Sequence, residues 1–67
     1  MQELLSPIRE AREKKKLTQV ELAKRVGVAN AAISGYESFT FRPAPDVAIK
    51  IAAELGITLD KIYGRVA

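Results

Sequence analysis

Apolar side chains recur along the chain at spacings of three and four residues, which indicates helices that pack through one face. Nowhere do apolar and polar residues alternate for long enough to predict a strand. The spacing predicts five short helices, at about residues 7–16, 19–26, 30–37, 45–55 and 59–63, the first of which begins between residues 4 and 7. We therefore expect one all-helical domain over residues 1–67, with no internal repeat and no linker.

Residue types that begin and end helices stand where these elements need them. Ser6 is a suitable N-cap, and the proline that follows it is tolerated in a first turn. Thr18 and Glu21 have the spacing of a capping box, in which each side chain accepts a hydrogen bond from the other residue's backbone N–H. Gly27 and Gly56 follow the second and fourth helices, where glycine readily takes the left-handed conformation that ends a helix.

The positions expected to face the core are mainly apolar. They are Leu4, Leu5, Ile8 and Arg12 in the first helix, Leu22, Ala23 and Val26 in the second, Ile33 and Tyr36 in the third, Val47, Ile51, Ala52 and Leu55 in the fourth, and Ile57 and Ile62 beyond it. Phe39 and Phe41 lie in an otherwise polar loop, residues 38–44. We expect at least one of the two rings to fill the core, and the alternative is that the pair helps a partner bind.

The chain is short for an independently stable domain. A domain of this size buries only roughly 60% of the surface of its unfolded chain, and disulfides, metals or a partner subunit usually compensate. The 67 residues include no cysteine and no histidine, and the eight acidic residues are scattered. We therefore expect no metal, no cofactor and no small-molecule ligand, and we expect a homodimer.

Charge and hydropathy indicate the kind of partner and the compartment. The net charge of +3 and the pI near 9.5 suit a polyanionic partner, although an ordinary basic protein has the same values. No signal peptide or membrane span is visible in the sequence, and the lack of cysteine fits a reducing compartment. We therefore expect a cytoplasmic protein that does not engage a membrane.

The stretch from Gln19 to Glu37 is the most informative part of the chain. Two helices joined by a tight turn must cross closely if the second is to project from the surface. That crossing needs a small residue, Ala23, and a left-handed turn residue, Gly27. Apolar residues complete the pattern at Leu22, Val26, Val28, Ile33 and Tyr36. A generic helical hairpin rarely matches all seven positions together with the capping box.

This stretch resembles the Cro and lambdoid-repressor type of helix-turn-helix proteins. The resemblance runs without a gap from Ile8 to Tyr63. It is carried by Ile8-Arg9-Glu10-Ala11-Arg12, Leu17-Thr18-Gln19-Val20-Glu21-Leu22-Ala23, Gly27-Val28, Ile33-Ser34, Glu37, Pro43, Lys50-Ile51-Ala52, Leu55-Gly56-Ile57 and Leu59-Asp60. It implies an all-α, five-helix bundle of the lambda-repressor-like type that binds operator DNA as a two-fold dimer.

The resemblance also implies roles for single residues. The third helix would enter the major groove of double-stranded DNA, where each base pair presents a distinct pattern of donors and acceptors. The base-reading candidates are its outward positions, Asn30, Ala31, Ala32, Ser34 and Gly35. Asn30 is the strongest candidate because an amide can bond adenine N6 and N7 together. An alanine would meet a thymine methyl group, and Ser34 stays open between a base and a phosphate.

The remaining implied sites surround that helix. Phosphate contacts are expected from Thr18, Gln19, Thr40 and Arg42, and Gln19 can also brace the first base reader. Arg12 and Glu37 would form a buried ion pair with a structural role. The residues themselves add a dimer interface: Leu59, Tyr63 and Val66 are apolar and are not needed for the core, so we expect them to join two copies, with residues 39–45 as an additional contact, on an inverted repeat.

Several positions depart from the family pattern. Ala29 stands where a serine or threonine usually caps the third helix, so Asn30 is open to a capping role that would remove it from base reading. Gly35 costs about 1 kcal/mol inside a helix, and it is either a point of close approach to DNA or merely tolerated. Phe39 replaces the usual glycine after the third helix, which predicts a different exit turn.

These observations favour a transcriptional regulator, most simply a repressor. An enzyme is not expected, because the chain lacks a nucleophile–base constellation and a phosphate-binding glycine loop. The alternative is an antitoxin or adaptor that uses the same fold to bind a protein. The small and polar outward face of the third helix favours DNA over such a partner. The chain is also open to being the head of a longer repressor.

Overall fold

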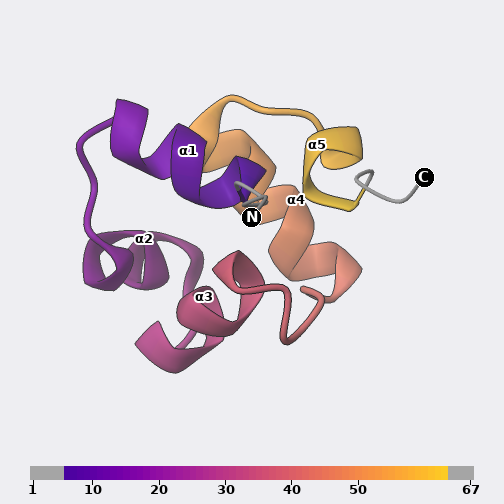
Figure 1. The fold of residues 1–67 in the computed structure, drawn as a ribbon, viewed down its shortest axis with the longest axis horizontal. Helices are drawn as coiled ribbons and strands as arrows, with labels where there is room; N and C mark the ends of the chain where they lie inside the picture. The colour runs from indigo at the N-terminus through magenta and orange to yellow at the C-terminus, as the bar shows by residue number, and fades with distance from the viewer. Residues whose placement is uncertain (1–5, 64–67) are drawn as a thin grey trace, which may run out of the picture.

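Five helices follow one another in residues 6–63, the part of the chain that this computed structural model describes (Figure 1). They are α1 (Pro7–Lys14), α2 (Gln19–Val26), α3 (Asn30–Glu37), α4 (Pro45–Leu55) and α5 (Leu59–Tyr63). No strand occurs within residues 6–63. The all-helical fold predicted from the sequence is confirmed, whereas Leu4, Leu5 and Val66 lie outside the described residues.

Three predicted caps are confirmed by the structure, whereas α1 ends at Lys14, two residues before the predicted end. Ser6 Oγ accepts from Arg9 N at 3.2 Å at the start of α1. At the start of α2, Thr18 Oγ1 accepts from Glu21 N at 3.0 Å and Glu21 Oε1 accepts from Thr18 N at 2.8 Å, which completes the capping box. Gly27 ends α2 in the left-handed region at φ 76°. Each signal depends on residues close in sequence, which explains why the pattern located them.

The core lies between helices that pack in two groups: α4 contacts α1, α2 and α5, and α3 contacts α1 and α2. Leu22, Ile33 and Ile51 are its largest fully buried side chains. The core consists of Ile8, Ala11, Leu22, Ala23, Val26, Ile33, Ala48, Ile51, Leu55 and Ile62, with Tyr36, Val47, Ala52 and Ile57 partly buried against it. Ala48 was not predicted, yet it is completely buried, because α4 packs against both α1 and α2.

The loop between α3 and α4 corrects one prediction. Neither phenylalanine fills the core: Phe39 is 39% exposed and Phe41 is 57% exposed. The backbone N–H groups of Thr40 and Phe41 both donate to Gly35 O, at 2.9 and 3.2 Å, and they fold the loop back over the end of α3. Phe39 takes φ 63°, so a left-handed residue occurs in this turn although the usual glycine is missing.

Candidate nucleic-acid interface

The outer face of α3 is formed by small and neutral side chains. Asn30, Ala31 and Ser34 are exposed, and Ala32 is half-buried. Figure 1 shows α3 at one edge of the bundle, with α1 and α5 on the opposite side. The single acidic residue of α3, Glu37, is only 9% exposed. The exposed face of this helix therefore carries no negative charge that would repel a polyanion.

Gly35 does not belong to that face. It is buried, and a Cβ added to it would come within 2.5 Å of Cε2 of the Phe41 ring. The expectation that Gly35 points outward is therefore wrong, and the close approach that requires a glycine is made by Phe41. The sequence could not reveal this contact, because it depends on how the loop folds back.

The start of α3 leaves Asn30 available. Ala29 occupies the N-cap position with extended backbone, and no side chain caps the helix. The capping role that the sequence left open for Asn30 is therefore not adopted. The side chain is exposed at the first position of α3 and does not cap the helix.

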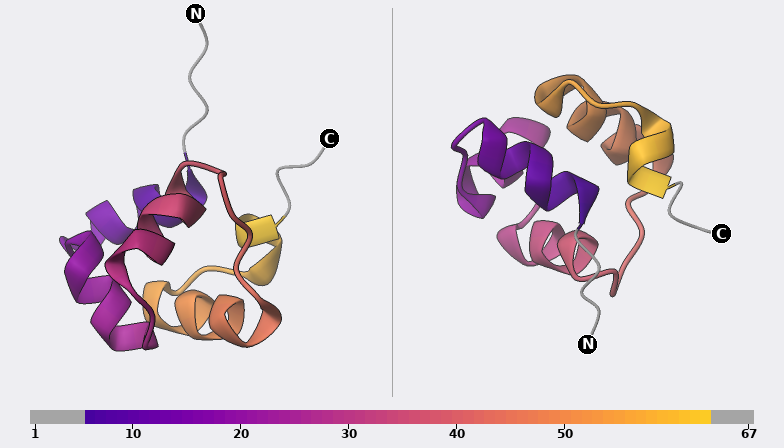
Figure 2. Two further views of the ribbon diagram at one scale, coloured as in Figure 1. Left: turned by 90° about the horizontal axis from the view of Figure 1, so that it is seen from below. Right: turned by 45° about the horizontal axis from the view of Figure 1, so that its top comes forward.

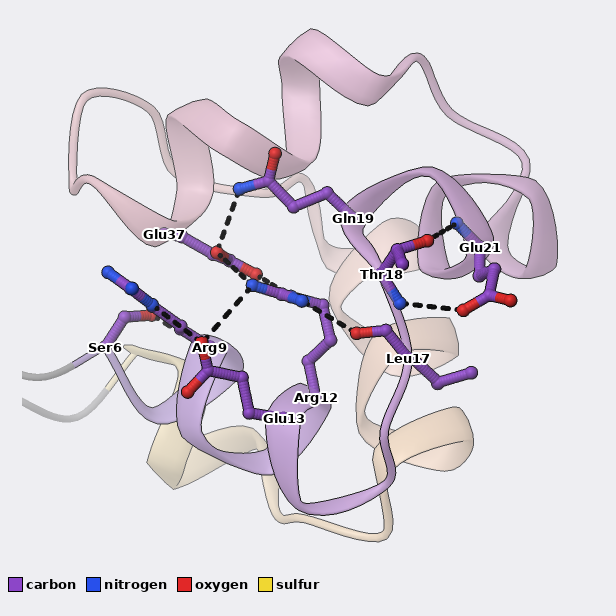
Figure 3. A network of polar contacts seen from close by, with 9 residues as sticks. All are labelled: Ser6, Arg9, Arg12, Glu13, Leu17, Thr18, Gln19, Glu21 and Glu37. Carbon is purple, nitrogen blue, oxygen red and sulfur yellow. Dashed lines mark hydrogen bonds and ion pairs between the residues drawn. The ribbon is translucent and has the colours of Figure 1, made fainter.

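Arg12 and Glu37 form a buried ion pair. Arg12 Nε donates to Glu37 Oε2 at 2.6 Å and Arg12 Nη2 donates to Glu37 Oε1 at 3.2 Å, a bidentate geometry (Figure 3). Arg12 Nη1 also donates to Leu17 O at 2.7 Å. The hydrogen bond with Glu37 raises the pKa of Arg12, against the opposing effect of burial. The pair thus links α1, the α1–α2 connection and the end of α3.

A third donor reaches the same carboxylate, and sequence reasoning missed it. Gln19 Nε2, at the first position of α2, donates to Glu37 Oε1 at 3.0 Å. Eighteen residues separate the two side chains in the sequence. Only the crossing of α2 and α3 brings them together, so no local signal could have shown the contact.

The other candidate phosphate contacts lie on both sides of α3. Thr18 is exposed, and its hydroxyl oxygen caps α2. Thr40 and Arg42 are exposed in the loop that Figure 2 shows arching between α3 and α4. Thr40 Oγ1 and Ser38 Oγ lie 2.8 Å apart in a hydrogen bond. Arg42 makes no ion pair with any of residues 6–63, so its charge is available to a partner.

The two predicted dimer residues that the structure describes differ in their exposure. Leu59 is 41% exposed, whereas Tyr63 is half-buried and donates its hydroxyl to Pro43 O at 2.8 Å. Tyr63 therefore attaches α5 to the loop after α3. Within the described residues, no cluster of acidic side chains could bind a metal ion, and no helix is long and apolar enough to cross a membrane.

A sequence profile described as helix-turn-helix matches residues 8–62. The chain belongs to the helix-turn-helix family. Its α2 and α3 are the two helices that give the family its name, joined here through Gly27. The lambda-repressor-like type that the sequence resembles is thereby confirmed.

Two individual proteins resemble this helix-turn-helix chain. YobD, an uncharacterized HTH-type transcriptional regulator of Bacillus subtilis (strain 168), is 32% identical over 57 residues, which are 85% of this chain and 51% of YobD. The chain thus spans about half the length of that relative. The P22 c2 repressor, crystallised with a synthetic operator, has a TM-score of 0.81 and 32% identity, over 90% of this chain and 94% of its own.

Proposed function

We propose that this chain is a sequence-specific, double-stranded DNA-binding transcriptional regulator that acts as a repressor. The observation that carries the proposal is the exposed face of α3, which is small, polar and free of negative charge among the described residues. A major groove admits a helix, and such side chains can meet base edges without repulsion from the phosphates. The similar P22 c2 repressor was crystallised with an operator, which supports the same use here.

The proposed contacts divide into those that read bases and those that set the register on the backbone. Asn30 reads an adenine, and Ala31 and Ala32 offer methyl groups to a thymine. Ser34 contacts a base or a phosphate. The phosphate contacts come from Thr18 and Gln19 at the N-terminus of α2 and from Thr40 and Arg42 in the loop after α3. Free backbone N–H groups at a helix N-terminus add attraction for an anion.

We further propose that the regulator binds an inverted repeat as a homodimer. The exposed Leu59 on α5 and the neighbouring loop, residues 39–45, offer apolar surface for a second copy. Two recognition helices would then need to lie about 34 Å apart to enter successive major grooves. Tyr63 contributes less than the sequence suggested, because its hydroxyl is already bonded to Pro43 O.

A second candidate function is supported by the two phenylalanines of the loop. Phe41 and Phe39 expose 57% and 39% of their surface, and both belong to the same loop. An antitoxin or adaptor would use this surface to bind a protein. The absence of negative charge on the described outer face of α3 has no purpose in that case, so we place DNA binding first.

Selection of bound duplexes from a random pool tests the proposal. We expect enrichment of an inverted repeat, and Asn30→Ala should weaken binding to it by about 1–3 kcal/mol and relax the preference at one base pair per half-site. Ala53→Ser, a small change on the exposed side of α4, is the control and should leave both measures unchanged. No enrichment by the folded wild-type protein would overturn the proposed function, and uniform weakening on all sequences would make Asn30 a phosphate contact.

A further inference from the structure

The Gln19 side chain has its orientation determined within the protein. Its amide nitrogen donates to Glu37 Oε1 at 3.0 Å. A carboxylate accepts hydrogen bonds and does not donate them, so the amide oxygen cannot take the place of the nitrogen. Figure 3 shows the result: the nitrogen of Gln19 points to Glu37 and the carbonyl oxygen points away from it.

The group that orients Gln19 is itself fixed. The Glu37 side chain is only 5% exposed, and Arg12 donates to both of its oxygens. A bidentate pair of this kind leaves the carboxylate little freedom to rotate. The Gln19 amide is therefore bonded to a rigid acceptor, and it loses fewer conformations when a ligand binds to it.

The oriented amide borders the surface proposed to meet DNA. A recess of about 320 Å³ is lined by Arg9, Arg12, Gln19, Ser34, Glu37 and Ser38. Ser34 belongs to the exposed face of α3. A different orientation of the Gln19 amide would therefore change the surface next to a candidate DNA contact. Glu37 uses one of the two Nε2 hydrogens, which leaves the second hydrogen and the carbonyl oxygen for a ligand.

We propose that Glu37 is a positioning residue for the DNA contact of Gln19. Glu37 is too deeply buried to reach DNA, and it acts by directing the Gln19 amide. The same carboxylate that joins α1 to α3 in the core thus sets the geometry of a contact at the start of α2. This inference rests on the proposed DNA-binding function, since it describes how one of its contacts is prepared.

The first test uses the free wild-type protein and needs no DNA. Nuclear magnetic resonance of the Gln19 side-chain amide should show a proton shift displaced from that of an unrestrained glutamine and restricted motion on the nanosecond timescale. In Glu37→Gln these signals should move to the positions of an unrestrained glutamine. A wild-type amide that already behaves as an unrestrained glutamine would overturn the proposal, even if DNA binding is intact.

The second test is a double-mutant cycle on the selected DNA, with wild type, Gln19→Ala, Glu37→Gln and the double variant. Glu37→Gln should weaken binding about fivefold in the wild-type background and by no further amount once Gln19 is alanine, as expected of residues that act as a unit. Equal losses in both backgrounds would show that Glu37 acts through stability alone, and would overturn the proposal.

Two controls keep these outcomes separate. Circular dichroism establishes that each variant is folded before binding is measured, because Glu37→Gln alters a buried pair. If that variant does not fold, the wild-type amide measurement decides alone, for or against. If the folded wild type binds no DNA, the proposed function fails, whereas the amide measurement still determines whether Glu37 orients Gln19.

Discussion

Glu37 is the residue on which most of the candidate site depends. It accepts hydrogen bonds from Arg12 and Gln19, side chains that belong to α1 and α2, while it lies itself at the end of α3. Burial of a charge is costly unless the charge is paired and hydrogen-bonded. Every buried side-chain nitrogen and oxygen of the described residues has a partner, so this cost is met at Glu37.

Removal of one partner of this pair should be strongly destabilising. Arg12→Met leaves a buried carboxylate without its cation, which typically costs about 3–5 kcal/mol of unfolding free energy. The double variant Arg12→Met, Glu37→Leu should recover most of that loss, because no charge is then left buried. Urea unfolding followed by circular dichroism measures both. Arg9→Met, on the exposed side of α1, is the control and should cost less than about 1 kcal/mol; an equal loss at Arg9 and Arg12 would contradict the argument.

Arg42 has a charge that is unpaired within the described residues. Arg42→Ala should lower affinity on every DNA sequence and reduce the slope of log K against log salt by about one unit. Fluorescence anisotropy at several salt concentrations measures this slope. Lys14→Ala is the control. Lys14 lines a recess together with Leu55 and Ile57, and no residue of α3 lines that recess, so this variant should leave the salt slope unchanged. A slope that Arg42→Ala does not change would remove Arg42 from the interface.

The N-termini of α2 and α3 are capped differently. The capping box of α2 is complete, and the hydrogen bond from the Thr18 N–H lowers the pKa of Glu21 below its ordinary value of 4.5. Because the pKa is lowered in the folded protein, the stabilisation by Glu21 is present above the ordinary value and is lost as the pH falls through the lowered one. In contrast, no side chain caps α3, and Ala32 N–H in its first turn donates only to the backbone Ala29 O, at 3.0 Å.

This contrast predicts opposite effects of two substitutions. Thr18→Ala should lower the unfolding free energy by about 1 kcal/mol, since it removes the acceptor for Glu21 N. Ala29→Ser should raise it by about 0.5–1 kcal/mol, because Ala29 already has the extended backbone of an N-cap. Thermal unfolding of both variants at pH 7 is the measurement. Ala29→Ser without any gain would mean that water satisfies the start of α3 as well as a hydroxyl does.

The molecule is small: ten buried apolar residues form the core within residues 6–63, and the sequence has no cysteine for a disulfide. Such a domain gains stability from contact with a second copy. The candidate surface is on α5, where Leu59 is 41% exposed, beside the loop that Tyr63 attaches to it. The fold as a whole leaves α3 at one edge, so a contact through α5 does not cover it (Figure 1).

Sedimentation velocity tests this arrangement. Wild type should form a dimer, at least on DNA with an inverted repeat, whereas Leu59→Glu should remain monomeric because it places a charge in the contact. Lys61→Glu is the control, because it places a glutamate at another exposed position of α5. Thr58 is unsuitable for this purpose, because its hydroxyl oxygen accepts a hydrogen bond from Lys61 N at the start of the helix. A wild-type protein that stays monomeric at all concentrations and binds a half-site as well as the full repeat would contradict the dimer.

The helices, their caps and most of the core could be predicted from the order of residues alone. Ser6, the Thr18–Glu21 box and Gly27 act through neighbours three or four residues away, so their effects are readable from spacing. The resemblance to a known family added Arg12 and Glu37 as a pair. The exposed positions of α3 followed from helical periodicity, with the exception of Gly35.

Other contacts could be known only from the tertiary structure, because they depend on how α2 and α3 cross and on how the loop after α3 folds back. Gln19 meets Glu37 because α2 and α3 cross at their ends, and Phe41 covers Gly35 because two backbone hydrogen bonds turn the loop back. Phe39 adopts a left-handed conformation that its residue type disfavours, since the surrounding structure requires it there. These contacts join residues whose separation along the chain carries no periodic signal, and packing alone brings them together.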